Sequence, residues 1–330
     1  MSYRRRITMT DISIVIVSYN TIDTTRKCLS LVKECLTEKK TEVIVVDNSS
    51  TDGSVEMIKD EFKFVKLIEL KENRGFAAGN TPGMKIARGR YILLLNPDSF
   101  IETGVLTKTV DYMDLNPKTG ILGCKLTDIY GKMQPSARMQ PGIINKILHI
   151  TGLSARFPDS KLFGRLDYTW WDHDSPKNVG WVVGAFFMIR RETMVDLGYL
   201  DHRYFLYYEE IDYCLNAHKK GWEVIFFPHA SVIHLGGVSS KKCGTKVSKK
   251  GSQMVKVKIK SELRFYRKWH NMFYVLLLSG FEILWNFAVY MKNSIKRSRD
   301  SKIKRDNAKY MIKSLVGTLF RDNLGNGSHV

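Results

Sequence analysis

The chain up to Leu95 contains four apolar runs that alternate with segments of helical periodicity, and this alternation constrains the fold most. The runs are Ile12 to Ser18, Glu42 to Val46, Val65 to Glu69 and Tyr91 to Leu95. The first two runs are continuously apolar, which predicts strands buried on both faces of a parallel sheet, and the other two are expected to be further strands. Because helices are expected between the strands, the pattern implies right-handed crossovers and a doubly wound α/β sheet.

The second half of the chain predicts a less regular set of elements around the same sheet. Strands are expected at Gly120 to Thr127, Val182 to Ile189, Glu223 to Phe227 and Ser231 to His234. Helices are expected at Arg191 to Leu197 and at Glu209 to Lys220, where Gly221 ends the second one. The predicted fold class is therefore α/β, with a mixed sheet and flanking helices.

Polar residues follow the predicted strands at the points where the strands end. They are Tyr19 and Asn20, Asp47 and Asn48, and the run from Asn96 to Ser99. In doubly wound sheets, ligands bind beyond the carboxyl ends of the strands. We therefore expect a ligand site at this edge of the sheet.

The charge balance is strongly basic, with 52 Lys and Arg against 33 Asp and Glu and a net charge of +19. Such an excess attracts polyanions, either nucleic acid or an anionic membrane surface. Five scattered cysteines without a CxxC pair argue against a disulfide framework and indicate a reducing compartment. The basic N-terminus is followed by a strand pattern, so no cleavable signal peptide is expected.

An apolar stretch from Met272 to Met291 is just long enough to span a bilayer. Glu282 lies at its middle, where a charge that faces lipid is unfavourable, and this favours an interfacial helix over a spanning one. A basic segment, Lys241 to Lys260, precedes the stretch and is expected to be a linker. Packing of the helix on its own domain or on a dimer partner is the alternative.

Several motifs together resemble one enzyme family. They are VIVSYN at 15–20, VVDNSSTDGS at 45–54, NRGFAAGN at 73–80, LLLNPDS at 93–99, GAFFMIRRE at 184–192, and YYEEIDYC at 207–214 with His234. In this order they resemble the family 2 glycosyltransferases with a GT-A fold, in particular the rhamnosyltransferase-like branch. The resemblance runs from about Asp11 to Ser240.

The resemblance, together with the composition of the C-terminal segment, divides the chain into four expected parts. Residues 1–10 form a basic tail, residues 11–125 the nucleotide-sugar-binding half, residues 126–240 the acceptor-binding and catalytic half, and residues 241–330 a basic linker with a membrane-associating helical tail. The implied activity is inverting, metal-dependent transfer of a sugar. L-rhamnose from dTDP-rhamnose is the favoured donor. The basic and apolar C-terminal segment favours a saccharide carried on a polyprenyl diphosphate as the acceptor, in cell-surface polysaccharide synthesis.

The implied nucleotide-sugar site consists of residues at the strand ends and in the NRG segment: Tyr19, Asn20, Asp47, Asn73, Arg74, Gly75, Asn96, Asp98 and Gly184. The resemblance assigns Asp47 to the nucleobase, and an Asp that caps the following turn is an equal reading. Arg74 can pair with diphosphate oxygens or remain a solvated loop residue. Thr81 and Pro82 depart from the family pattern and place the geometry of the following helix in question.

Asn96-Pro97-Asp98 stands where related enzymes carry Asp-x-Asp. One carboxylate, Asp98, remains, and with diphosphate oxygens it can hold Mg²⁺ or Mn²⁺. The resemblance adds His234 as a second metal residue. A simple turn after a strand and a structural histidine are the alternative readings.

An acidic cluster opens the predicted helix at Glu209 and carries the expected base. The resemblance points to Glu210 as the group that takes the proton of the acceptor hydroxyl, with Asp212 second and Glu209 in support. Acidic residues also stabilise the first turn of any helix, so a purely structural role is the alternative.

Three other functions stay open at this point. A transferase of the same fold could use a UDP-hexose or a UDP-N-acetylhexosamine. The altered residues Asn96 and Glu210 would also suit a non-catalytic nucleotide-sugar sensor. A nucleic-acid-binding protein is disfavoured because the positive charge is densest beside the apolar stretch. We expect the cytoplasmic face of the cell membrane as the location, by peripheral contact or a single anchor, and leave a homodimer open.

Overall fold

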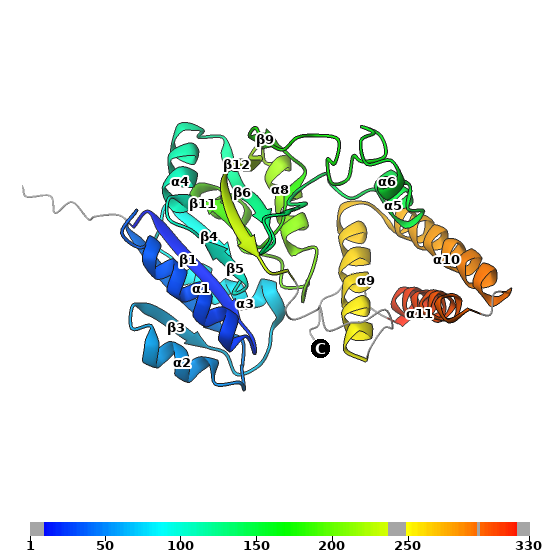
Figure 1. Cartoon of the computed structure of the whole chain (residues 1–330), viewed down its shortest axis with the longest axis horizontal. Coiled ribbons are helices and arrows are strands. Elements are labelled where there is room, and N and C mark those ends of the chain that lie inside the picture. The colour runs from blue at the N-terminus through cyan, green and yellow to red at the C-terminus, as the bar shows by residue number, and fades with distance from the viewer. Residues whose placement is uncertain (1–9, 237–248, 296–297, 322–330) are drawn as a thin grey trace, which may run out of the picture. The chain divides into compact units, whose positions relative to one another are not determined.

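A computed structural model describes residues 10–236, 249–295 and 298–321 of the chain (Figure 1). The chain divides into two compact units. The first unit, called the sheet unit, comprises residues up to 140 together with 171–201 and 210–236. The second, called the helical unit, comprises residues 141–170, 202–209 and the chain from 237 onward. The functional division expected at residue 125 stays a prediction.

The sheet unit begins with the predicted doubly wound pattern. Its first strands are β1 (Ile12–Ser18), β2 (Thr41–Asp47), β3 (Val65–Glu69) and β4 (Tyr91–Leu95), and they pair in parallel in the order β3-β2-β1-β4. The connecting helices are α1 (Ile22–Cys35), α2 (Ser54–Glu61) and α3 (Gly75–Ile86). The buried residues of β1, β2 and β4 are mostly apolar, which confirms the reading of the first two runs as central strands. Strand β3 lies at the edge of the sheet and is partly exposed.

The second half of the sheet unit makes the sheet mixed, as expected. The main elements are β5 (Ser99–Ile101), α4 (Val105–Leu115), β6 (Thr119–Thr127), β11 (Phe186–Arg190), α7 (Arg191–Leu197), α8 (Glu209–Lys219) and β12 (Glu223–His234). Strand β11 lies antiparallel between β4 and β6. The sheet order continues β4-β11-β6-β12-β5. Short pairings are made by β7 (Met133–Gln134), β8 (Ala137–Arg138), β9 (Lys177–Asn178) and β10 (Trp181–Val182).

Three expectations for this half need correction. The single strand expected over Val182 to Ile189 is broken, because the Val183 N–H donates to Ser136 O and β11 begins only at Phe186. The two strands expected between Glu223 and His234 form one strand, β12, which shifts register after Phe227. Strand β5 and helix α4 were not predicted.

Helix α3 packs unusually close to the sheet because two of its glycines face β1 and β2. A Cβ at Gly83 would lie 2.5 Å from Val15 Cγ1, and one at Gly79 would lie 3.1 Å from Val17 Cγ1. The helix also runs through Pro82 to Ile86, so Pro82 does not interrupt it. The Thr81 hydroxyl donates to the Ala77 carbonyl one turn earlier. The segment after Asn80, whose helical geometry the sequence left in question, therefore continues α3 as a regular helix.

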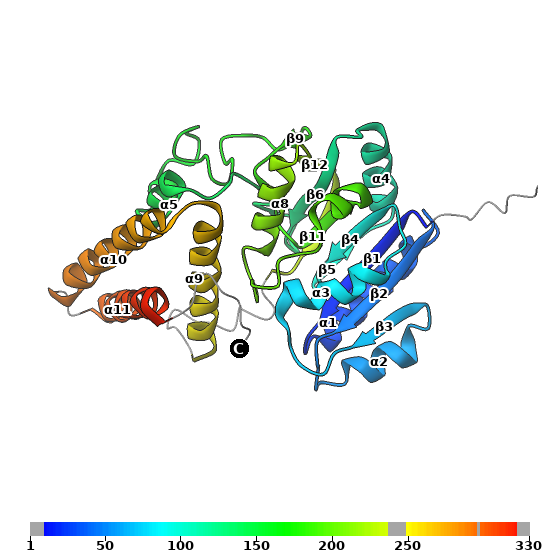
Figure 2. The same cartoon turned by 180° about the vertical axis from the view of Figure 1, so that it is seen from behind.

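The helical unit contains α5 (Ile143–Ile150), α6 (Leu153–Arg156), α9 (Lys249–Trp269), α10 (Met272–Ile295) and α11 (Arg299–Arg321). Helices α9 and α11 both pack on α10, and α10 and α11 run side by side in both views (Figures 1 and 2). The linker expected up to Lys260 is helical from Lys249 onward, and its earlier part lies outside the described residues. Among described helices, α10 alone has the length and composition to cross a membrane.

Candidate active site

Asp47 stands at the carboxyl end of β2 and is 2% exposed. Its Oδ2 accepts the Ser50 N–H at 2.8 Å, which turns the following loop. Its Oδ1 is buried and has no hydrogen-bond partner among the described residues. A buried carboxylate oxygen without a partner is unfavourable in the absence of a ligand. Asp47 can therefore have both of the roles considered from the sequence. Oδ2 holds the turn, and Oδ1 is able to accept a hydrogen bond from a ligand.

Asn20 and Tyr19 follow β1 on the same edge. Asn20 has a φ of 51°, its Oδ1 accepts the Thr51 N–H at 2.8 Å, and its own N–H donates to Ser50 Oγ at 3.0 Å. The Asn20 side chain thus fixes the loop after β2. Tyr19 leaves 44% of its surface exposed, so its ring is accessible to a ligand.

Asn48 connects the end of β2 to the NRG segment. Its Nδ2 donates to Asn73 Oδ1 at 2.9 Å and to Gly75 O at 3.0 Å, while its Oδ1 accepts the Arg74 N–H at 2.9 Å. The position of Asn48 at a strand end was visible in the sequence, but this bridging role was not. The Arg74 side chain is exposed and its Nε donates to Glu72 Oε1 at 3.2 Å, so it is held only by a surface ion pair.

The turn after β4 brings Asp98 beside His234. The Ser99 N–H donates to Asn96 O at 3.0 Å, which closes the turn, and β5 then pairs with β12 so that Ser99 faces His234. Asp98 Oδ1 lies 3.6 Å from His234 Nε2. The segment thus forms a turn, and this turn places a carboxylate beside an imidazole.

Gln134, which the sequence did not single out, fixes the orientation of the His234 ring. Its Nε2 donates to the His234 carbonyl at 2.8 Å, so its Oε1 faces His234 Nδ1 at 3.1 Å. An oxygen at this position requires a proton on Nδ1. In the neutral imidazole the lone pair is then on Nε2, the atom that faces Asp98.

Gly184 joins the other motifs in space. A Cβ at Gly184 would lie 3.8 Å from Phe76 Cζ and 4.0 Å from Glu210 Cβ. The next residue, Ala185, accepts the Asn96 N–H at 3.1 Å. Gly184 therefore lies between the NRG helix, the turn that carries Asp98 and the first turn of α8. Its lack of a side chain leaves space at this junction.

The three acidic residues of α8 differ in their surroundings. Glu209 and Asp212 are each 4% exposed and lie three positions apart, on one face of the helix. Glu210 is half-buried, and its Oε2 has no hydrogen-bond partner among the described residues. Burial raises the pKa of Glu210 to about 7, although its own backbone N–H and the charge of Arg138 act to lower it. Glu210 is thus the member with partial access and a pKa suited to a base near neutral pH.

The described residues contain no cluster of three or more His, Cys, Asp or Glu side chains that could enclose a metal ion. Asp98 and His234 supply one carboxylate oxygen and one imidazole nitrogen. Mg²⁺ is commonly held by one or two protein ligands together with substrate phosphates and water. The pair therefore fits a cation whose coordination is completed by diphosphate oxygens. It does not fit a structural metal site that is enclosed by protein ligands alone.

Residues 13–195, more than half of the chain, match the family model of glycosyl transferase family 2. The chain therefore belongs to this family, and the protein is a glycosyltransferase. The residues at the sheet edge described above fall within the matched range as far as Gly184, while Glu210 and His234 lie beyond it.

Curated relatives include transferases with different donors. The chain is 28% identical over 215 residues to the N-acetylglucosaminyl-diphospho-decaprenol L-rhamnosyltransferase of Mycobacterium tuberculosis, over 60% of this chain and 67% of that protein. It is 35% identical over 131 residues to the poly(ribitol-phosphate) beta-glucosyltransferase of Bacillus spizizenii, over 38% of this chain and 20% of that protein.

Solved structures share the fold. The mannosyltransferase PcManGT of Pyrobaculum calidifontis, solved with GDP-Man and Mn²⁺, aligns with a TM-score of 0.56 and 13% identity, over 96% of this chain and 89% of that one. GalNAc-T7, solved with UDP, GalNAc and Mn²⁺, aligns with a TM-score of 0.56 and 15% identity, over 96% of this chain and 58% of that one. These likenesses establish the expected GT-A type architecture.

Proposed function

We propose that the protein is an inverting glycosyltransferase that moves L-rhamnose from dTDP-rhamnose to a saccharide carried on a polyprenyl diphosphate. The observation that carries the proposal is the convergence at Gly184 of Phe76 and Glu210, with the Asn96 turn bonded to the adjacent Ala185. Donor-side and base-side residues, far apart in sequence, meet there because a glycine lies between them.

The donor side of the proposal rests on the β2 and NRG residues. Asp47 Oδ1 accepts a hydrogen bond from the base, and Tyr19 is available to stack on it. The network of Asn48 and Asn73 fixes the start of α3, whose N-terminal N–H groups favour an anionic diphosphate. Arg74 turns from Glu72 to the diphosphate, since its surface ion pair is weak.

Asp98 and His234 hold the divalent cation together with the diphosphate of the donor. When bound, Mg²⁺ or Mn²⁺ neutralises the charge that develops on the departing nucleoside diphosphate. Asn96 lies two residues before Asp98 in the same turn and contributes by hydrogen bonding. Two solved structures of the same fold contain Mn²⁺, which supports this assignment.

Glu210 acts as the general base on the acceptor side. Its carboxylate takes the proton of the acceptor hydroxyl while the hydroxyl oxygen forms a bond to the anomeric carbon. The bond from that carbon to the diphosphate breaks on the opposite side, which inverts the configuration. Glu209 and Asp212 are more deeply buried and support the start of α8.

The choice of donor and acceptor draws on the relatives. The mycobacterial relative is named as an L-rhamnosyltransferase acting on an N-acetylglucosaminyl-diphospho-decaprenol, and its alignment is the longer of the two. The Bacillus relative is named as a glucosyltransferase and has the higher identity over a shorter segment. A UDP-hexose transferase is therefore the second candidate. A lipid-linked acceptor favours the cytoplasmic membrane surface as the location.

The test is release of nucleoside diphosphate from a panel of nucleotide sugars by the full-length protein. The assay contains a polyprenyl-diphosphate-linked saccharide extract, with and without Mg²⁺ or Mn²⁺. We expect metal-dependent release from dTDP-rhamnose, and release from a UDP-sugar instead would support the second candidate.

A matched pair of variants connects the activity to the site. Glu210→Gln should reduce turnover by about 10²- to 10⁴-fold, the usual contribution of a general base. Glu192→Gln makes the same change at an exposed position of α7 and should leave turnover unchanged. Full turnover in Glu210→Gln would exclude Glu210 as the base.

A further inference from the structure

Between Met272 and Met291, helix α10 exposes only apolar residues and buries polar ones beside part of its apolar residues. Between Met272 and Met291 every exposed residue is apolar: Met272, Phe273, Leu276, Leu277, Leu284, Phe287, Ala288 and Met291, called here the outer face of α10. The buried side includes Ser279 and Glu282, which are 1% and 6% exposed. A surface helix of a soluble domain has the reverse arrangement. The outer face of α10 is therefore suited to an apolar environment.

The charge at the middle of α10 is neutralised inside the helical unit. Lys146 Nζ, from α5, lies 2.9 Å from Glu282 Oε2 and 2.8 Å from Glu262 Oε1 of α9. All three side chains are largely buried. Glu282, which in the sequence favoured an interfacial helix over a spanning one, thus points away from the outer face and leaves that face uncharged.

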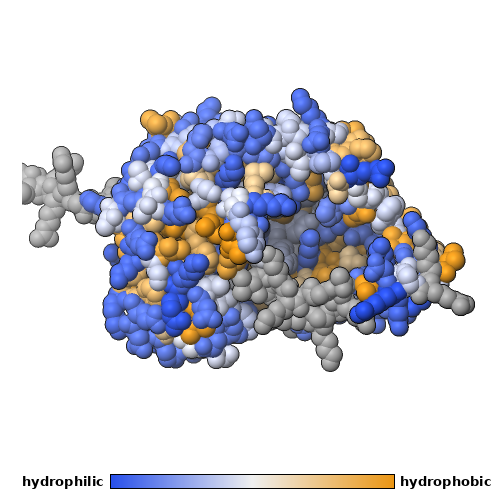
Figure 3. Space-filling model, in the orientation of Figure 1, coloured by the Kyte–Doolittle hydropathy of each residue, from blue (hydrophilic) through white to orange (hydrophobic). Residues whose placement is uncertain are grey.

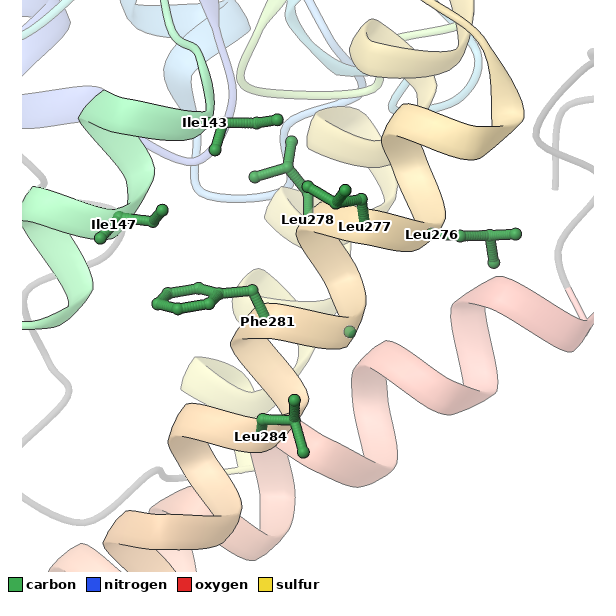
Figure 4. A pocket seen from close by; sticks show the side chains of 8 residues that line it. Ile143, Ile147, Leu276, Leu277, Leu278, Phe281 and Leu284 are labelled. Atoms are coloured by element: carbon green, nitrogen blue, oxygen red, sulfur yellow. The ribbon is translucent and has the colours of Figure 1, made fainter.

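A groove between α5 and α10 widens this apolar surface (Figure 4). It has a volume of about 350 Å³, and its lining is apolar: Ile143, Ile147, Leu276, Leu277, Leu278, Gly280, Phe281 and Leu284. Ile144 on α5 is also exposed. Figure 3 shows hydrophobic patches beside hydrophilic residues on the face of the molecule that is turned to the viewer.

The exposed lysines of helix α11 limit the orientations in which α10 can lie in a bilayer. It packs along α10 and exposes Lys302, Lys304, Lys309 and Lys313. If α10 crossed the membrane, these lysines would be carried into the hydrocarbon, where an exposed charge is strongly disfavoured. If α10 lies in the plane of the membrane, the long lysine side chains can reach the headgroups.

The charge of the same region indicates which surface it meets. In residues 249–321 the acidic residues are Glu262, Glu282, Asp300 and Asp306, against many more lysines and arginines. Two of these acids are already paired with Lys146. An apolar helix face with adjacent basic residues is typical of helices that bind anionic membrane surfaces.

We propose that α10 is an in-plane membrane helix, which inserts its outer face into the cytoplasmic leaflet while the α11 lysines contact anionic headgroups. The proposal extends the proposed membrane location. It rests on the helical unit alone, so it can fail or hold independently of the sugar-transfer chemistry.

Vesicle binding by the full-length protein tests the insertion. Wild type should sediment with vesicles of phosphatidylcholine and phosphatidylglycerol. The double variant Leu284→Glu/Phe287→Glu should bind them at least about tenfold more weakly, because two apolar side chains that insert into the bilayer are lost. Leu115→Glu makes the same change at an exposed leucine of α4 and should bind like wild type. Equal binding by all three proteins would overturn the proposal.

The lysines are tested separately. Lys309→Gln and Lys313→Gln should each weaken binding to phosphatidylglycerol vesicles about fivefold, and the effect should disappear on pure phosphatidylcholine. Loss of binding on both lipids to the same degree would contradict headgroup contact.

Cysteine labelling distinguishes an in-plane helix from a spanning one. Lys268→Cys and Asp300→Cys place thiols before and after α10, in a chain that also carries Cys243→Ser; the other four cysteines are buried. In sealed inverted vesicles from expressing cells, a membrane-impermeant maleimide should label both positions. Labelling of only one position before permeabilisation would show a spanning helix.

A second copy of the chain is the competing occupant of the outer face. Three results together would show that the outer face is a subunit interface and not a membrane contact. The wild type would form a dimer without detergent, Leu284→Glu/Phe287→Glu would be a monomer, and the wild type would not bind vesicles. Light scattering on the two proteins measures this directly.

Discussion

At the scale of single residues, the surroundings of Glu210 separate it from its acidic neighbours. Three carboxylates within one helical turn look equivalent in sequence. In the structure Glu209 and Asp212 are deeply buried, while Glu210 keeps partial access beside Gly184.

The raised pKa of Glu210 gives a pH dependence with a defined sign. Below about pH 7 the buried carboxyl is protonated and cannot accept a proton, and above it the carboxylate is ionised and competent. We expect kcat/KM to rise with pH through an apparent pKa near 7. A rise that persists in a weakly active Glu210→Gln protein would assign the titration to another group.

Gln134 is expected to act on the proposed metal site through His234. Gln134→Leu removes the oxygen that holds the Nδ1 proton, and loss of such a partner usually weakens metal affinity by about 10- to 100-fold. Mn²⁺ binding in the presence of dTDP, followed by electron paramagnetic resonance, measures this without turnover. Gln253→Leu, at an exposed position of α9, is the control. Equal affinity in both variants would leave Gln134 a purely structural residue.

At the scale of elements, the position of α3 on the sheet depends on two glycines, Gly79 and Gly83. Gly83 faces Val15, a β-branched residue with little rotational freedom, so an added methyl group cannot be accommodated easily. The NRG segment begins this helix. The close packing of α3 on the sheet therefore also determines where the donor residues lie.

Gly83→Ala should lower the free energy of unfolding by about 1–3 kcal/mol, the usual effect of overpacking. Gly280→Ala is the matched control, because a Cβ there meets nothing within 4 Å and alanine is the better helix former. It should be neutral or stabilise by up to about 1 kcal/mol. Thermal denaturation of both variants measures the difference, and equal melting temperatures would contradict the close packing.

The buried charges of α5, α9 and α10 give a second prediction at this scale. Lys146→Met removes the lysine that is paired with both Glu262 and Glu282, which should destabilise the helical unit by about 3–5 kcal/mol at pH 7. Burial and the neighbouring Glu262 raise the pKa of Glu282, so the folded state binds its proton more tightly than the unfolded state. The deficit should therefore shrink as the pH falls toward 5.

Calorimetry at the two pH values measures this deficit, with Lys302→Met as the exposed control. A deficit that is the same at both pH values would show that the loss comes from packing and not from charge.

At the scale of the whole molecule, the two units divide the tasks between them. The sheet unit carries the donor and base residues, and the helical unit carries the apolar face and most of the surplus positive charge. Under the proposals above, one unit performs the transfer and the other brings the enzyme to the surface that contains its lipid-linked acceptor.

This division predicts that the two functions can be separated. Leu284→Glu/Phe287→Glu should bind the nucleotide donor like wild type in solution, because neither residue is in the sheet unit. Transfer to an acceptor embedded in vesicles should fall at least about tenfold, in proportion to the lost membrane binding. Isothermal titration with dTDP and a vesicle-based transfer assay measure the two quantities. Parallel loss of both would show that the variant is misfolded.

The sequence by itself determined the α/β pattern, the order of the first four strands along the chain and the polar residues at their carboxyl ends. These are local properties, since apolar periodicity fixes strands and helices, and parallel strands place their ends at one edge. It did not reveal β5 or the break before β11, because both are short and depend on pairing with strands distant in sequence.

Only the tertiary structure decided which residues meet. Asp98 reaches His234 because β5 pairs with β12, and Glu210 faces Phe76 across Gly184 because β11 inserts between β4 and β6. The structure also decided in which direction Glu282 points. From the sequence its charge favoured an interfacial helix over a spanning one, but the side of α10 that carries it was unknown. Lys146 and Glu262 lie on the inner side of that helix, so the apolar residues are left to face outward.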